Sequence, residues 1–305
     1  MRNPSVIVFY VLTFVCCSTS NSVEPFTLAQ KSLQRLASVE FTGREPGTSG
    51  HKQAQQYIVS VFNSDEKSSD KIILHNFTYQ KNFQTKLGTN IIFHKIGTIY
   101  PNKLIVITAH YDHLGKQGRK VFLGADDNAS GTAIMLGLQQ FFKNKKTKYS
   151  LLFVATDAEE DDLAGSRALV QSNYIIDKNI ILNINLDMVA HGYRKKYLYV
   201  HKKSADLALD KILNKYHQID SNVILKSKRY LASDRSSISR RRIDLAKASD
   251  HYEFAKIGIA YLFITGENHK HYHKPTDSYD KVDINFYGKV FASMKSLITL
   301  IDNEI

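Results

Sequence analysis

Four short runs of the chain are almost continuously apolar: residues 104–110 (LIVITAH), 151–156 (LLFVAT), 180–187 (IILNINLD) and 259–265 (IAYLFIT). Short runs of this kind, rich in β-branched side chains, are typical of strands that are buried on both faces of a sheet. Two more polar, alternating runs, at 71–79 and 90–97, favour half-exposed antiparallel strands. The pattern therefore predicts a mixed, mostly parallel sheet.

Between these runs, apolar residues recur at intervals of three and four, which is the spacing of an amphipathic helix. Five segments show it: residues 27–39, 52–62, 130–142, 204–216 and 285–302. Buried strands that alternate with amphipathic helices need helices on both faces of the sheet. We therefore predict an α/β fold, a three-layer α/β/α sandwich around the mixed sheet. No internal repeat or linker divides the chain, so we expect a single domain over residues 23–305.

The beginning of the chain has a different composition. Arg2 is followed by a short apolar run at residues 6–17 and then by small polar residues, a pattern typical of a secretory signal peptide. We expect residues 1–22 to be removed and the protein to be periplasmic or secreted. Lipid attachment at Cys16 or Cys17 is the alternative, but the residues before them are bulkier than such a signal usually has. No later run reaches the ~20 apolar residues of a membrane span.

The charge and the cysteines limit the chemistry. Both cysteines lie in the predicted signal peptide, so any metal site of the mature chain must use histidine and carboxylate ligands. The formal net charge is +12, but the positive residues are scattered, with local groups at 143–148 and 239–242. A nucleic-acid binder would need a coherent basic face, and no base-stacking motif accompanies these groups. We expect no nucleic-acid partner.

Each predicted buried strand ends in side chains that can bind a metal ion. They are His110, Asp112 and His113; Asp157, Glu159 and Glu160; Asp187; and His269, His271 and His273. In open α/β sheets, ligands collect beyond the carboxyl ends of the strands. A single His or Asp at such a place is more often a helix cap or a solvated turn residue. The repetition at four strands is what indicates a site.

A fifth segment, GADDNASG at residues 124–131, precedes a predicted helix. Its aspartates could form an N-cap, or could place one carboxylate between two cations. A set of two histidines and three carboxylates fits zinc, with a position left open for water.

These motifs occur in the order AHYDH (109–113), GADDNASG (124–131), EE (159–160), NLDMV (185–189), SDHYEF (249–254) and YHKPTD (272–277). In this order they resemble the co-catalytic dizinc aminopeptidases, a family of secreted bacterial leucyl aminopeptidases whose relatives include glutamate carboxypeptidase and glutaminyl cyclase. The resemblance covers roughly residues 104–290. No one motif is specific, but the ordered set is.

The resemblance implies two zinc ions per chain. One zinc would bind His110 and Asp187. The other would bind Glu160 and His273. Asp127 would bridge both ions, with a cis peptide bond after it.

Two further residues take roles from the same resemblance. Glu159 would be the general base, and Asp112 would hold the imidazole of His110. Family members usually have glycine where this chain has Asp161 and Asp162, a departure that alters the rim and not the ligands. We expect those two residues and Asp157 to be caps or rim residues. His269 resembles a family position near the substrate, whereas His271 is expected at the surface.

The implied activity is that of a zinc exopeptidase, which removes N-terminal residues from peptides with a free N-terminus. We expect the enzyme to be a monomer. A glutaminyl-peptide cyclotransferase with a single zinc is the nearest alternative, but its members tend to have Trp beside the final histidine and to lack the ASG at 129–131. This chain has no Trp and keeps ASG. A non-catalytic binding homologue is the other alternative, which the complete set of ligand positions argues against.

Overall fold

The computed structural model describes residues 24–63, 71–176, 178–192, 194–203, 206–220, 222–232 and 242–305. The predicted signal peptide at 1–22 lies outside the described residues and stays a prediction. None of the helices in these ranges combines the length and apolarity that a bilayer span requires.

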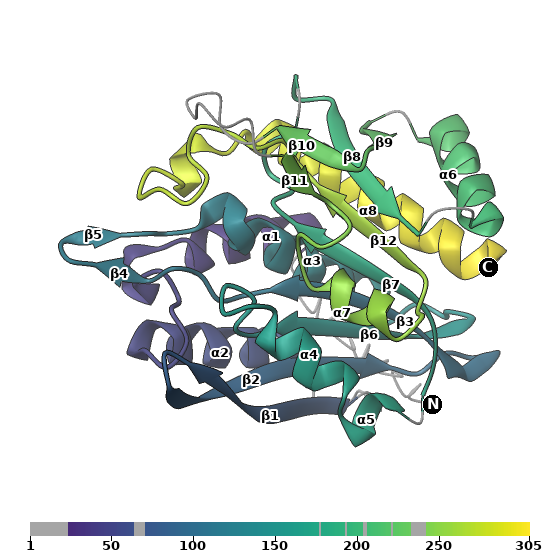
Figure 1. Cartoon of the computed structure of the whole chain (residues 1–305). Helices are drawn as coiled ribbons and strands as arrows, with labels where there is room; N and C mark the ends of the chain where they lie inside the picture. Colours follow the sequence, from purple (N-terminus) through teal and green to yellow (C-terminus); the bar gives the residue numbers. More distant parts are fainter. Residues whose placement is uncertain are drawn as a thin grey trace, which may run out of the picture.

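An eight-stranded sheet forms the centre of the molecule, with the strand order β1-β2-β6-β3-β7-β12-β8-β9 (Figure 1). In this order the strands are Lys71–Lys81, Gln84–Lys95, Tyr149–Thr156, Tyr100–His110, Asn179–Asp187, Tyr261–Thr265, Tyr197–Lys202 and Ile224–Ser227. The four predicted buried strands are β3, β6, β7 and β12, which are neighbours and run parallel. The polar runs form the antiparallel hairpin β1–β2. The predicted mixed sheet is confirmed.

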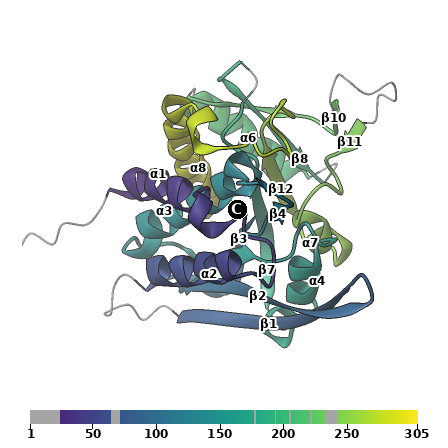
Figure 2. The same cartoon turned by 90° about the vertical axis from the view of Figure 1, so that its left-hand side faces the viewer.

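The five predicted helices are present, and all of them pack against one face of the sheet (Figure 2). They are α1 (Pro25–Leu36), α2 (Ser49–Phe62), α3 (Gly131–Lys143), α6 (Leu207–Ile219) and α8 (Ile284–Glu304). Side-chain caps at Thr48, Asp206 and Asp283 accept backbone N–H groups at the beginnings of α2, α6 and α8.

Three short helices cover the opposite face: α4 (Ala164–Val170), α5 (Asn173–Ile176) and α7 (His251–Lys256). They are too short to show a helical period in the sequence, which is why the hydrophobic pattern did not predict them. With them, the three-layer sandwich is complete and the predicted fold class is confirmed.

Smaller elements surround the sheet. A short 3-10 helix, η1 (Val39–Phe41), lies between α1 and α2, and another, η3 (Tyr279–Lys281), precedes α8. The pairs β4 (Lys116–Gln117) with β5 (Lys120–Val121), and β10 (Tyr230–Ala232) with β11 (Arg242–Asp244), form two-stranded sheets. The irregular helical segment η2 (Ala125–Ser130) leads into α3 and contains a cis peptide bond between Asp127 and Asn128, as the resemblance implied.

The strand register decides where the predicted site residues lie. His110 of β3 is aligned with Thr156 of β6, and Asp187 of β7 is aligned with Thr265 of β12. The four buried strands therefore end at one edge of the sheet, and the loops that follow them meet there.

Candidate metal centre

Five loops or strand ends at this edge carry the five predicted ligands. His110 and Asp187 are the last residues of β3 and β7, and Asp127 lies in η2. Glu160 follows β6, and His273 follows β12. The structure brings all five side chains to one place.

One group of metal-binding atoms is centred on His110. Its Nε2 atom lies 3.4 Å from Asp127 Oδ1 and 3.4 Å from Asp187 Oδ1. Glu159 Oε2 lies 4.0 Å from the same nitrogen. These atoms belong to four separate segments of the chain: the ends of β3 and β7, η2 and the loop after β6.

A second group is centred on His273. Its Nε2 atom lies 3.0 Å from Asp127 Oδ2 and 3.4 Å from Glu160 Oε2. Asp127 therefore turns one oxygen toward each group. This division of a single carboxylate is the geometry that a bridging ligand needs.

The chemistry of these atoms fits zinc. Tetrahedral coordination at ~2.0 Å places ligand atoms about 3.3 Å apart, which is close to the spacings in both groups. Nε2 of His110 and Oδ1 of Asp187 are buried without a hydrogen-bond partner among the described residues. Buried polar atoms are nearly always paired, so these unpaired atoms point to a cation as their partner.

The sequence analysis noted His113 at the end of β3 but assigned it no role. The structure places it, fully buried, with Nδ1 at 2.9 Å from Glu160 Oε1 and 3.8 Å from Asp127 Oδ2. His113 therefore contacts two proposed ligands of the second group. Its position three residues after the end of the buried strand, beside Asp112, was the signal in the sequence.

Asp112 makes more contacts than the resemblance implied. Its Oδ1 atom lies 3.5 Å from His110 Nδ1. Its two oxygens also accept the backbone N–H groups of Glu159 and Glu160, at 3.1 and 3.2 Å. One buried carboxylate thus orients a proposed ligand and fixes the loop that carries the glutamate pair.

The crowding of carboxylates changes their pKa values. Burial raises the pKa of Glu159 well above its ordinary value; His110 opposes this rise, and the charges of Asp187 and Glu160 add to it. Burial alone would also raise the pKa of Asp127, but the imidazoles of His110 and His273, which lie close to its carboxylate, bring it well below its ordinary value. A bound cation would favour the ionised form of every carboxylate here.

The other acids of the loop after β6 do not share one environment. Asp162 is exposed and pairs with Arg167, as expected for a rim residue. Asp157 differs from the expectation, because it is fully buried and its Oδ1 atom lies 2.7 Å from His51 Nε2. It ties α2 to the end of β6. Asp161 is also buried at its carboxylate, where it accepts a hydrogen bond from the Tyr79 hydroxyl at 2.7 Å.

The two additional histidines of the loop after β12 are also placed. His271 is partly exposed, and its Nδ1 atom lies 2.9 Å from the Thr276 hydroxyl. The side chain of His269 is mostly buried, with Nε2 at 3.0 Å from Asp126 Oδ2. The structure therefore places His269 against another protein side chain.

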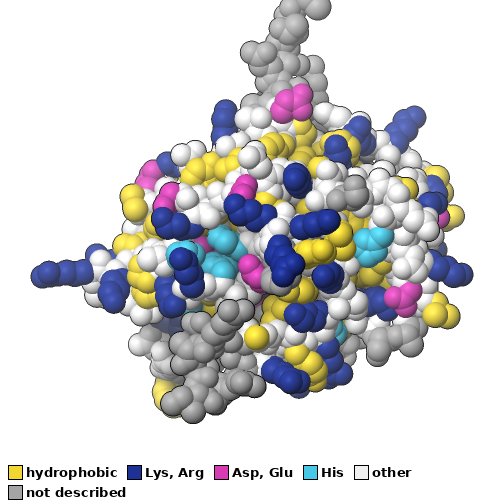
Figure 3. Space-filling model, turned by 90° about the horizontal axis from the view of Figure 1, so that it is seen from above, with side chains coloured by type: hydrophobic (Ala, Val, Ile, Leu, Met, Phe, Trp, Pro, Cys, Tyr) yellow, Lys and Arg dark blue, Asp and Glu magenta, His cyan; other side chains and the backbone are white. Residues whose placement is uncertain are grey.

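A cavity opens beside the proposed metal centre. The carboxylates of Asp127, Glu159, Glu160 and Asp187 line one part of it. Another part has an apolar wall, formed by Met188, Leu231, Ile243, Leu245, Ala248 and Phe263. Leu231 and Ile243 come from β10 and β11, which border residues 233–241, outside the described residues. On the face drawn in Figure 3, several histidine side chains form one group among scattered Lys and Arg side chains, and another histidine lies apart from this group.

Comparison with known proteins shows a family match over the part of the chain that contains the site. The model of peptidase family M28 matches residues 90–298. The alkaline phosphatase isozyme conversion protein of Escherichia coli is 27% identical over 206 residues, which cover 63% of this chain and 59% of that protein. Aminopeptidase YwaD of Bacillus subtilis is 29% identical over 213 residues, which cover 66% of this chain and 42% of that protein. The chain thus spans about half the length of these relatives.

Solved structures share the fold over nearly the whole chain. The LapA aminopeptidase of Legionella pneumophila superposes with a TM-score of 0.69 at 16% identity, covering 92% of this chain and 72% of that one. A glutaminyl cyclase of Porphyromonas gingivalis superposes with a TM-score of 0.68 at 18% identity, covering 92% and 98%. Because both activities occur on this fold, the fold does not distinguish between them.

Proposed function

Because the chain belongs to peptidase family M28, we propose that it is a zinc-dependent aminopeptidase, which hydrolyses the N-terminal peptide bond of peptides. The observation that carries this proposal is the division of Asp127 between two groups of metal-binding atoms, one around His110 and one around His273. That division supports two zinc ions per chain, as in other two-metal hydrolases.

The proposed coordination uses only residues that meet at this edge of the sheet. His110 and Asp187 would hold one zinc. Glu160 and His273 would hold the other, and Asp127 would bridge both. Zinc, when bound, lowers the pKa of a coordinated water and polarises a carbonyl oxygen.

Glu159 is the proposed general base. Its carboxylate lines the cavity and makes no side-chain hydrogen bond to the described residues, and its nearest charged partner is His110 at 4.0 Å. It is therefore free to accept a proton from the attacking water and to pass that proton to the leaving amine. Proton transfer by a positioned side chain contributes ~10²- to 10⁴-fold to the rate.

The cavity supports a preference for the free end of a peptide. Its carboxylates attract a positively charged α-amino group, which an internal peptide bond lacks. Its apolar wall, which includes Leu231 and Phe263, would take the side chain of the N-terminal residue. Burial of apolar surface at ~25 cal/mol per Å² favours large apolar residues such as leucine over small ones.

A panel of aminoacyl-arylamide substrates, with and without added zinc, tests reaction, cofactor and specificity together. We expect hydrolysis of the leucyl substrate and its loss with a chelator. We expect Glu159→Gln to lower kcat by ~10²- to 10⁴-fold while two zinc ions per chain are retained. The matched control Asp162→Asn changes an exposed acid of the same loop and should keep the rate. A zinc-loaded wild type that cleaves none of the substrates would refute the proposal.

The cyclase alternative is supported by the shared fold of the cyclase from Porphyromonas gingivalis. A cyclase with a single zinc would use only one of the two groups of metal-binding atoms that share Asp127. The presence of both groups supports the peptidase. Release of ammonia from peptides with N-terminal glutamine, without release of free glutamine, would indicate the cyclase instead. A zinc-free protein that binds peptides without cleaving them would indicate the non-catalytic alternative.

A further inference from the structure

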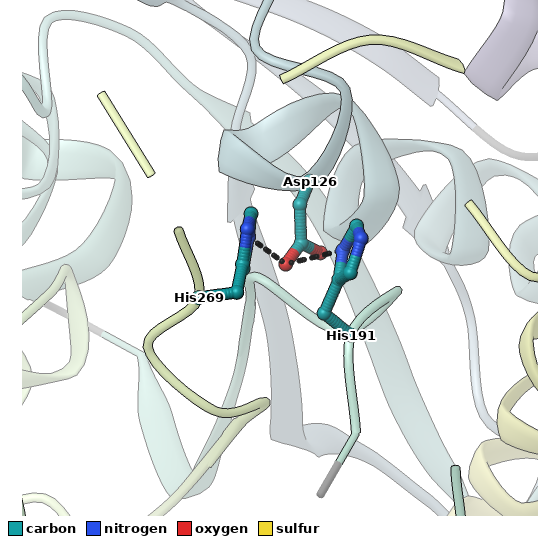
Figure 4. Close-up of side chains that lie close together, drawn as sticks. All are labelled: Asp126, His191 and His269. Atoms are coloured by element: carbon teal, nitrogen blue, oxygen red, sulfur yellow. Dashed lines mark hydrogen bonds and ion pairs between the residues drawn. The ribbon is translucent and has the colours of Figure 1, made fainter. Parts of the chain in front are cut away.

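A separate cluster of titratable side chains lies beside the proposed metal centre and contains none of its proposed ligands. It consists of Asp126, His191 and His269, which we call the Asp126 cluster (Figure 4). Both His191 Nδ1, at 3.1 Å, and His269 Nε2, at 3.0 Å, approach the same oxygen, Asp126 Oδ2. The sequence analysis assigned no role to Asp126 or His191.

The carboxylate of Asp126 is fully buried, and both of its oxygens have partners. While Oδ2 faces the two histidines, Oδ1 accepts the backbone N–H of Ala190 at 2.7 Å and the Ser130 hydroxyl at 3.1 Å. His269, Ser130 and Ala190 donate hydrogen bonds to this buried carboxylate, His191 contacts it as an ion pair, and together they hold it in one position. The parts of the chain that supply these donors are held with it.

The three side chains have a composition that can bind zinc, but their orientation favours direct contacts. The rings of His191 and His269 are stacked, with centroids 4.0 Å apart and planes 20° apart. A metal ion lies in the plane of each imidazole that binds it, and two stacked, nearly parallel rings have no nearby point that lies in both planes. His269 Nδ1 already accepts the backbone N–H of His271 at 3.2 Å, which leaves Nε2 as the donor to Asp126.

Each member of the cluster is close in sequence to a proposed zinc ligand in a different loop. Asp126 directly precedes Asp127. His191 follows Asp187 by four residues, and His269 precedes His273 by four residues. The cluster therefore links three loops. One carries Asp187, a proposed ligand of the first ion, another carries His273, a proposed ligand of the second ion, and the third carries Asp127, which would bind both.

We propose that the Asp126 cluster positions these three loops and so sets the spacing of the ligands around both zinc ions. This inference rests on the proposed function, because it takes the dizinc centre as given. Asp277, from the loop after β12, also holds the segment that carries Asp127. It accepts the backbone N–H groups of Asp126 and Asp127 at 3.0 to 3.1 Å. Asp127 is thus held from two sides before any cation binds.

Replacement of the histidines tests the role of their N–H groups. His269→Leu removes the hydrogen bond to Asp126, and His191→Leu removes the ion-pair contact with the same oxygen. Each should weaken zinc binding by ~10- to 100-fold, as loss of residues that orient metal ligands usually does. His269→Gln keeps an amide N–H within reach of the Nε2 position, and His191→Asn does so for Nδ1. Both conservative variants should bind zinc nearly as the wild type does. The readout is the zinc dissociation constant, measured by competition with a chromophoric chelator.

The matched control is His271→Ala in the same loop. Its side chain contacts Thr276, and the backbone N–H that it donates to His269 is unaffected by the change. We expect wild-type zinc affinity. Unfolding of the zinc-free variants, followed by circular dichroism, shows whether each leucine variant is folded before zinc is added. If a leucine variant does not fold, its conservative partner and the control still test the proposal.

The outcomes separate this inference from the proposed function. Leucine variants with wild-type zinc affinity would overturn it, as would a glutamine or asparagine variant that is as weak as its leucine counterpart. Three zinc ions in the wild type and two in the leucine variants would show that the cluster is itself a metal site, which also overturns it. A wild type that binds no zinc would refute the proposed function, and the inference with it.

Discussion

His251 of α7 shows how burial sets the properties of a single residue. Its ring is fully buried and stacks on Phe263, with centroids 4.3 Å apart, and its Nε2 atom donates to the carbonyl oxygen of Leu245 at 2.8 Å. Burial lowers the pKa of His251 to about 3, because the charged form would lose its hydration. The residue is therefore neutral in the folded protein at neutral pH.

This pKa shift predicts a loss of stability in acid. An unfolded histidine has a pKa of about 6.5, so between pH 6.5 and about 3 the unfolded state binds the additional proton. The stabilising effect is fully present above pH 6.5. It is lost as the pH falls, by up to about 1.4 kcal/mol per pH unit. Urea unfolding of the zinc-free protein between pH 7.5 and 5 measures the slope.

His251→Gln provides the comparison, since glutamine keeps a donor for Leu245 but does not titrate. The slope of unfolding free energy against pH should be shallower in this variant than in the wild type, by up to about 1.4 kcal/mol per unit. Equal slopes in the two proteins would show that His251 does not contribute.

At the scale of elements, Arg44 connects the helical layer to the site. Its guanidinium is fully buried and donates hydrogen bonds to four backbone carbonyls, those of Leu36, Tyr111, Leu123 and Gly124. These carbonyls belong to the end of α1, the loop after β3 and the segment before η2. Arg44 thus joins the two loops that carry His110 and Asp127.

Arg44→Lys should lower the free energy of unfolding, because an ammonium group cannot reach four carbonyls in the fork geometry of a guanidinium. Each carbonyl left buried without a partner costs about 1–3 kcal/mol. Arg35→Lys is the matched control in α1. Arg35 forms an exposed pair with Glu40, and such pairs contribute about 0–1 kcal/mol. Denaturant unfolding of the zinc-free proteins compares them, and equal losses would contradict the role of Arg44.

The pair β10–β11 supplies part of the apolar wall of the cavity, which makes it an element of specificity. Leu231→Ala should lower kcat/KM for a leucyl substrate by ~10-fold or more, since each methylene in an apolar pocket contributes about 1–3 kcal/mol. The alanyl substrate does not fill the pocket and is the internal control. An unchanged ratio of leucyl to alanyl hydrolysis would show that the substrate side chain lies elsewhere.

For the whole molecule, the main consequence of the site is a link between metal binding and folding. Five carboxylates (Asp112, Asp127, Glu159, Glu160 and Asp187) gather at one edge of the sheet, and all are buried or nearly so. Without a cation they repel one another, and the proposed zinc ions would relieve this repulsion only in the folded chain, where the ligands meet.

Zinc should therefore raise the stability of the whole protein. At a free concentration 1,000 times the dissociation constant, each ion adds about 4 kcal/mol to the free energy of unfolding. Scanning calorimetry with increasing zinc measures the rise in Tm. Glu160→Ala, which removes a ligand of one proposed ion, should show a smaller rise. An identical rise in both proteins would argue against Glu160 as a ligand.

Much of the architecture could be predicted because its signals are local. Apolar runs and three-four spacing indicated the four central strands and the five long helices, and parallel strands bring their carboxyl ends to one edge wherever they occur. His110, Asp127, Glu160, Asp187 and His273 were singled out on that ground and by resemblance. The structure brings them together, and their roles as ligands stay proposals.

What the sequence determined by itself was therefore the type and order of the elements and the edge at which the site residues gather. Only the tertiary structure decided that His113 contacts Glu160, that Asp157 is buried against α2, and that His191 meets Asp126. Helices α4, α5 and α7 likewise became visible only in the packed molecule. The physical reason is that hydrophobic periodicity is a property of neighbours along the chain. A contact between distant side chains depends on register, loop course and packing together, and none of these is encoded in one short segment.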